Sequence, residues 1–153
     1  MSVIKGLEEI NDLSIDEKKE IAVEEFDELY NILENKYANL FDDIYQMDDG
    51  FVLFLFDLMR VGITADSDLM REEIDLIQYI LKESGDTDFE EDAVIDLFRG
   101  AERHHYELVQ RVFALMEPDE SKHIVAFLAA IVSIDGRLDP SEVAFIDSLF
   151  EKV

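Results

Sequence analysis

The chain has no cysteine and no tryptophan among its 153 residues, and it contains only 2 prolines and 6 glycines. The absence of cysteine excludes disulfides, thiolate metal sites and thiol catalysis, and it is typical of a reducing compartment. Basic side chains are also few, because 13 Lys and Arg oppose 38 Asp and Glu, for a formal net charge of −25. Such a field repels phosphate backbones and anionic headgroups, so we expect neither nucleic acid nor a membrane surface as a partner.

Long hydrophobic runs are missing as well. The longest uncharged apolar run is Ile124–Val132, nine residues, whereas a membrane-spanning helix needs about 20. The first residues lack the basic and apolar regions of a signal peptide. The chain is nevertheless 48% hydrophobic with 11 Phe, which is too apolar for a disordered acidic chain. We therefore expect one soluble, cytoplasmic domain over residues 1–153.

Apolar residues recur at steps of three and four, and this pattern predicts an all-α fold of about six or seven helices. A long apolar stripe begins after Ser14–Glu17, which has capping-box spacing, and ends at Asp48-Asp49-Gly50. A second capping box at Asp88–Glu91 predicts one helix that continues to about Met116. The other helices are expected at about 51–63, 69–82, 120–133 and 140–151.

Two helix pairs resemble each other when residues are aligned at an offset of 69. Any two amphipathic helix pairs match to some degree, because both follow the same period. Helical phase does not predict the charged positions, however, and Asp66 matches Asp135 while Glu73 matches Glu142. We interpret the pattern as an internally duplicated helix–turn–helix, with the two copies related by a pseudo-two-fold axis. The repeat halves span approximately 51–83 and 120–153.

The repeated acids are the candidate functional residues. Asp135 directly follows an apolar helix, whose C-terminal end carries partial negative charge, so a carboxylate there is disfavoured by about 0.3–1 kcal/mol. A bound cation would reverse that penalty, although Asp135-Gly136 is also typical of an ordinary turn. Glu142 has the position of an ordinary capping residue. Glu73 is nevertheless kept in the first copy, where the preceding Asp-Pro cap is lost.

These turns are not EF-hands. A calcium loop of that type needs Asp-x-[Asp/Asn]-x-[Asp/Asn]-Gly and a Glu at its twelfth position. Here Gly follows the first Asp directly in one copy and is absent from the other, and the twelfth positions are Ile77 and Ile146. A metal site of carboxylates without thiolates favours Mg²⁺, Ca²⁺ or Mn²⁺. The predicted metal ligands are Asp66, Glu73, Asp135 and Glu142.

The segment Val132–Val143 reads Val-Ser-Ile-Asp-Gly-Arg-Leu-Asp-Pro-Ser-Glu-Val. It resembles the signature of TerB-like tellurite-resistance proteins: an apolar helix, Asp-Gly, a short turn and a Glu that opens the next helix. The resemblance implies a bacterial, cytoplasmic, stress-associated all-helical protein that carries the motif twice. It also implies a divalent-cation site built from the paired acids, and no established enzymatic activity. The match is good for 120–153 and looser for 51–83, where Ser67 replaces the Gly.

Two alternatives come from other features. Glu102-x-x-His105 and Glu120-x-x-His123 have the spacing of di-iron carboxylate ligands, although such motifs arise by chance in a Glu-rich chain. A protein-interaction module would instead present a groove lined by tyrosines of the first long helix, whose spacing is more typical of core packing. These tyrosines are Tyr30, Tyr37 and Tyr45. Phosphate loops, hydrolase elbows and His-Glu-x-x-His are absent. We therefore expect a non-enzymatic protein that binds a divalent cation, a protein partner or both through its acidic turns.

Overall fold

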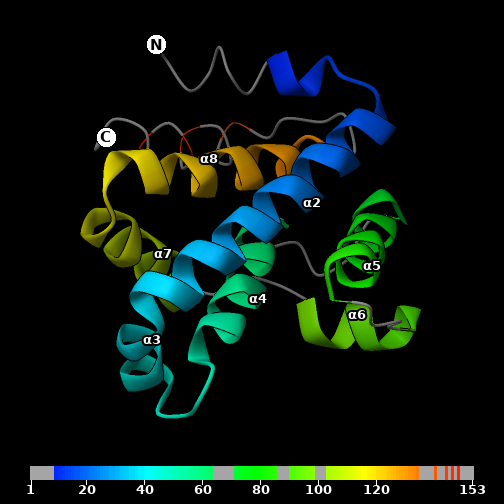
Figure 1. The fold of residues 1–153 in the computed structure, drawn as a ribbon. Coiled ribbons are helices and arrows are strands. Elements are labelled where there is room, and N and C mark those ends of the chain that lie inside the picture. The colour runs from blue at the N-terminus through cyan, green and yellow to red at the C-terminus, as the bar shows by residue number, and fades with distance from the viewer. Residues whose placement is uncertain are drawn as a thin grey trace.

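The computed structural model describes residues 9–63, 71–85, 90–98 and 103–134, together with positions 140, 144, 146 and 148. These residues are largely helical and include no strand, which confirms the predicted all-α class (Figure 1). Seven α-helices and one π-helical segment follow one another in the described parts of the chain. They are α2 (Ile15–Ile32), η1 (Leu33–Tyr37), α3 (Ala38–Tyr45), α4 (Gly50–Gly62), α5 (Arg71–Gly85), α6 (Glu91–Phe98), α7 (Arg103–Leu115) and α8 (Pro118–Val132).

Helix α2 begins at the predicted capping box. The Glu17 amide donates a hydrogen bond to the Ser14 hydroxyl at 3.2 Å, and the Ser14 amide donates to the Glu17 carboxylate at 3.4 Å. The apolar stripe then continues through η1 into α3, but with a π-helical turn that was not predicted. The apolar residues of this segment keep steps of three and four, which an uninterrupted α-helix would show as well. The buried members of the stripe are Ala22, Phe26, Leu29, Leu33 and Phe41.

A tight turn brings α3 and α4 together. Gln46 and Asp49 adopt left-handed backbone conformations, with φ of 54° and 59°, and α4 begins at the next residue, Gly50. A Cβ atom at Gly50 would lie 2.3 Å from the carbonyl oxygen of Phe41. Only glycine permits this approach of the two backbones.

Helix α4 is the centre of the molecule, and α2 crosses the elements around it. α4 contacts α2, α3, α6, α7 and α8, and most of its side chains are buried. α2 lies across α8 and also packs on α5 and α4 (Figure 1). Because α4 and α5 belong to the first predicted half and α8 to the second, α2 joins both halves in one hydrophobic core.

The single helix predicted from Asp88 to Met116 is wrong. The structure has two helices there, α6 and α7, which lie on opposite sides of α4 (Figure 1). The intervening sequence contains Gly100, and glycine in a helix interior costs about 1 kcal/mol relative to alanine. α6 ends at the buried Phe98, whose ring meets Phe56 of α4 edge-on with centroids 5.4 Å apart. The second capping box lies outside the described residues, apart from Glu90 and Glu91.

Helices α4 and α8 agree with the predicted offset of 69. Residues 50–62 of α4 correspond to 119–131, and α8 spans Pro118–Val132 with its proline in the first turn. The two helices pack against each other. Within this contact, a Cβ atom on Gly62 would lie 2.8 Å from Cγ2 of Ile131. Gly62 and Ile131 are the same position of the two copies, because 62 and 131 differ by 69. Contact between equivalent positions is expected beside a two-fold axis, and this contact therefore supports the duplication. The bounds of the two repeat halves and the single domain over residues 1–153 stay predictions.

Candidate functional site

One of the four predicted metal ligands, Glu73, falls in the described residues. It lies in the first turn of α5 and is only 5% exposed. Glu73 precedes Ile77 and Ile80 on the same helical face, so a carboxylate begins the stripe that faces the core. A buried carboxylate requires a compensating charge or hydrogen bonds. Asp66, Asp135 and Glu142 lie outside the described residues, so their placement relative to Glu73 stays a prediction.

The twelfth positions of the two turns are core residues. Ile77 and Ile146 are both buried, at 0% and 1% exposure. Neither position offers an oxygen ligand, and both side chains serve packing. This agrees with the exclusion of an EF-hand.

The C-terminal end of α8 contacts a lysine that the sequence pattern did not single out. Ser133 caps this helix, and its carbonyl oxygen accepts a hydrogen bond from Lys18 Nζ at 2.7 Å. Lys18 is only 3% exposed and is the single buried Lys or Arg among the described residues. The sequence did contain a sign that Lys18 is buried. Lys18 precedes Ala22 by four residues and Phe26 by eight, so it lies on the same face of α2 as these apolar residues. A cation at a helix C-terminus is favourable, so the chain itself supplies positive charge at the helix end that precedes Asp135.

A second buried charge organises α3, α4 and α7. Asp57 is 6% exposed, accepts a hydrogen bond from the Tyr45 hydroxyl at 2.5 Å and forms an ion pair with Arg60. Arg60 also donates to the Leu97 carbonyl at 2.8 Å, and His105 Nε2 lies 3.7 Å from the Asp57 carboxylate. Burial, and then the bond to Asp57, raises the pKa of Tyr45, so this tyrosine stays protonated. The cluster ties helices together around a compensated carboxylate.

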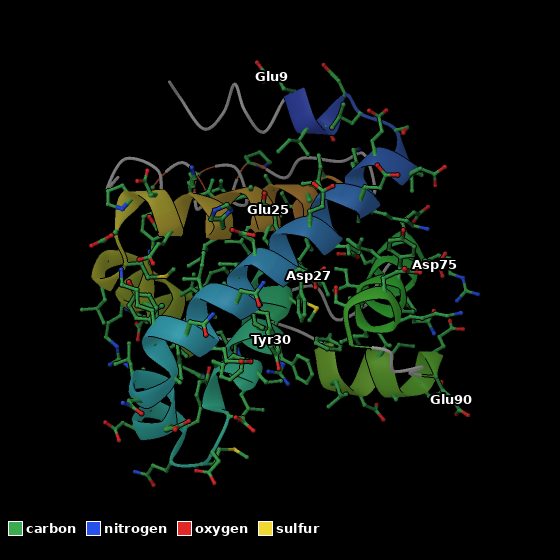
Figure 2. All side chains as sticks on the ribbon, in the orientation of Figure 1. Glu9, Glu25, Asp27, Tyr30, Asp75 and Glu90 are labelled. Atoms are coloured by element: carbon green, nitrogen blue, oxygen red, sulfur yellow. The ribbon has the colours of Figure 1, made fainter. Side chains whose placement is uncertain are left out.

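The di-iron alternative gains no support from the partners of its histidines. His123 Nδ1 lies 2.6 Å from the Glu25 carboxylate, where α2 crosses α8 (Figure 2). His105 belongs to α7 and contacts Asp57 of α4 instead. Across the described residues, no group of three or more His, Cys, Asp or Glu could hold a metal ion. Glu102 lies outside those residues.

Glu120, the remaining predicted iron ligand, is bonded within the fold. Its carboxylate accepts a hydrogen bond from the Tyr37 hydroxyl at 2.7 Å and one from Lys36 Nζ at 3.3 Å. The Tyr37 bond holds the pKa of Glu120 below its ordinary value. These contacts join the π-helical segment η1 to the first turn of α8.

The three tyrosines of the interaction-module alternative have separate partners. Tyr30 packs edge-on against Phe51, with ring centroids 5.0 Å apart, and retains 38% exposure. Tyr37 bonds Glu120 on α8, and Tyr45 bonds Asp57 on α4. Each therefore serves a different helix contact, and this geometry gives no support for a shared groove.

The molecule defined by these contacts is an acidic all-helical protein in which an N-terminal helix joins the halves of a predicted repeat. The described helices include none that is long and apolar enough to cross a membrane. Residues 56–152 match the family described as tellurite resistance protein TerB, and the chain belongs to this family. Comparisons with curated proteins and with solved structures gave no match. The family match begins within α4, so α2, η1 and α3 precede it.

Proposed function

We propose that this TerB-family chain is a non-enzymatic protein that binds a hard divalent cation through its two acidic turns. The predicted ligands are Asp66 and Glu73 in one copy and Asp135 and Glu142 in the other. The same two turns, with the cation bound, are also the proposed binding site for a protein partner.

The burial of Glu73 carries this proposal. Of the 38 acidic residues, Asp57 and Glu73 are the two that are buried among the described ones. Asp57 belongs to the cluster with Tyr45 and Arg60. Glu73 is the residue that the sequence repeat matches with Glu142, seven positions after an Asp in each copy. Mg²⁺, Ca²⁺ and Mn²⁺ prefer carboxylate oxygens as ligands, and Glu73 is a buried carboxylate in register with one of the two acidic turns.

The first prediction concerns thermal stability in the presence of cations. After chelator treatment and desalting, CaCl₂, MgCl₂ or MnCl₂ is expected to raise the Tm more than NaCl at equal ionic strength. Screening is then the same in both samples, and specific binding at a hundredfold excess over Kd adds about 2.7 kcal/mol. Equal shifts at matched ionic strength would contradict the cation site.

A pair of double variants separates specific ligands from general charge. Asp66→Asn with Asp135→Asn is expected to abolish the selective shift and to retain the helical circular dichroism signal. Asp27→Asn with Asp96→Asn removes the same charge from two exposed helix positions and should keep the shift. Loss of the fold in the first pair would show that these carboxylates act as structural caps instead.

A further inference from the structure

Two exposed apolar side chains adjoin the tight turn between α3 and α4. The exposed large hydrophobic residues of the described structure are Ile15, Tyr30, Met47 and Leu115. Ile15 begins α2 and Leu115 ends α7. Tyr30, near the end of α2 (Figure 2), packs instead on Phe51 in the first turn of α4. Met47 belongs to the turn that leads into this helix and is 52% exposed.

Carboxylates accompany these two side chains. Glu34 follows Tyr30 by four residues along the helix, and Asp48 and Asp49 directly follow Met47; all three acids are exposed. Burial, then Glu34 and finally Asp49, raises the pKa of the Tyr30 hydroxyl, so both carboxylates lie near it. Tyr30, Glu34, Met47, Asp48 and Asp49 together form what we call the Tyr30 patch.

No basic side chain of the described structure pairs with this patch. From Glu20 to Met59 the sequence has 11 acidic residues and a single basic one, Lys36. The Lys36 ammonium lies 3.5 Å from Glu117 and 3.3 Å from Glu120, both at the beginning of α8. The remaining ion pairs of the described residues also leave the acids of the patch without a basic partner. The patch therefore combines exposed apolar surface with uncompensated negative charge.

This combination fits an arginine side chain from outside the molecule. A guanidinium stacks on aromatic rings, and its fork of N–H groups donates to carboxylates. The flexible Met47 side chain adapts to apolar neighbours of such an arginine. We propose that the Tyr30 patch binds an arginine-rich segment of a partner protein, with one guanidinium stacked on Tyr30. The proposal goes beyond cation binding, because the patch shares no residue with the acidic turns.

Fluorescence anisotropy with a labelled peptide of alternating arginine and glycine tests the proposal on the full-length protein at about 0.1 M NaCl. Tyr30→Leu with Met47→Gln keeps an apolar side chain on Phe51 and removes the aromatic ring and the thioether. This pair is expected to weaken binding at least about fivefold. Ile15→Gln with Leu115→Gln removes two exposed apolar side chains elsewhere and should change the affinity less than about twofold.

A second pair of variants and a second peptide test the role of charge. Asp48→Asn with Asp49→Asn should weaken binding more than Asp92→Asn with Asp96→Asn, which removes the same charge from exposed positions of α6. Asparagine tolerates the left-handed conformation of Asp49. A lysine–glycine peptide of equal length and charge should bind at least about threefold more weakly than the arginine peptide, because an ammonium cannot stack or donate as a planar fork.

The results that would overturn the proposal are distinct. Equal losses in the Tyr30–Met47 and Ile15–Leu115 variants, or equal binding of the two peptides, would mean that only the overall charge attracts the peptide. Absence of binding to wild type would also refute the patch, whatever the cation titrations show. If wild type dimerises in sedimentation and the Tyr30–Met47 variant does not, the patch is an interface between copies instead. In wild type itself, the amide NMR signals of Tyr30 and Met47 must shift on peptide addition while those of Ile15 and Leu115 stay, so the test does not depend on a variant that fails to fold.

Discussion

Among single residues, the buried charges Lys18 and Asp57 are compensated in different ways. Lys18 donates to a helix C-terminal carbonyl, whereas Asp57 accepts from a tyrosine on α3 and pairs with an arginine one turn along α4. Leaving one partner of such a contact alone in the interior costs more than the contact itself contributes. Lys18 and Asp57 are therefore each suited to one position in the fold. The composition of the chain shows only that acidic residues outnumber basic ones.

The bond between Tyr37 and Glu120 leads to a pH-dependent prediction. The pKa of Glu120 is lowered from its ordinary value of 4.5, first by the Tyr37 hydroxyl. A lowered pKa in the folded state contributes stability above the unfolded value, and this contribution is lost as pH falls through the folded value. Tyr37→Phe is therefore expected to reduce the free energy of unfolding by about 1 kcal/mol at neutral pH, and by less at acidic pH below 4.5.

Urea denaturation across the pH range measures this difference. Tyr79→Phe on α5 is the matched control, because it also removes a phenolic hydroxyl, and no described hydrogen bond involves that group. The control should show no comparable pH dependence. If Tyr37→Phe lowers the free energy of unfolding by the same amount at neutral and at acidic pH, the Tyr37 hydroxyl does not lower the pKa of Glu120.

Among the helices, the crossing of α4 and α8 holds the two halves of the fold together. The helices approach so closely at Gly62 that any Cβ there would lie 3.0 Å from Cβ of Ile131 as well as 2.8 Å from its Cγ2. The Ile131 side chain is buried and cannot move aside freely. A small residue on one helix and a large one on the other thus set the distance between the two halves.

Substitution at this crossing should be strongly coupled. Gly62→Ala is expected to destabilise the protein by about 1–3 kcal/mol through overpacking, and Ile131→Ala by about 2–5 kcal/mol through a cavity. In the double variant the new methyl enters the space that isoleucine vacates, so the combined loss should fall at least about 1 kcal/mol short of the sum. Chemical denaturation of the four proteins gives the coupling. Additive losses would show that the two side chains do not meet.

For the molecule as a whole, a net charge of −25 opposes the compact state. Acids lie on the outer faces of several helices, and Figure 2 shows two exposed examples, Asp27 on α2 and Asp75 on α5. Their mutual repulsion acts over a Debye length of about 30 Å at 0.01 M salt and about 3 Å at 1 M. Monovalent salt alone should therefore stabilise the fold.

The expected result is a Tm that rises by at least about 2–4 °C between these salt concentrations, the shift that about 1 kcal/mol produces in a domain of this size. The double variant Asp27→Lys with Asp96→Lys makes the charge more positive by two units at each position. The formal net charge of the chain then changes from −25 to −21. This variant should be more stable at low salt and should gain less from added salt. A Tm that is independent of NaCl would mean that other charges already neutralise the repulsion locally.

The helical class, most helix positions, the Ser14 capping box and the family could all be predicted from the sequence alone. Each depends on local periodicity or on a short motif, and local interactions are encoded by neighbours in the chain. The break between α6 and α7 was missed because the apolar pattern continues in phase across Gly100.

The long-range contacts of the buried charges and of the helix crossing emerged only from the tertiary structure. Lys18 reaches Ser133, Asp57 takes Tyr45 as a partner, and Gly62 meets Ile131, although the members of the first and last pairs are far apart in the chain. These partners are brought together by the packing of whole helices. That packing depends on all the side chains at each interface and not on spacing along one stripe.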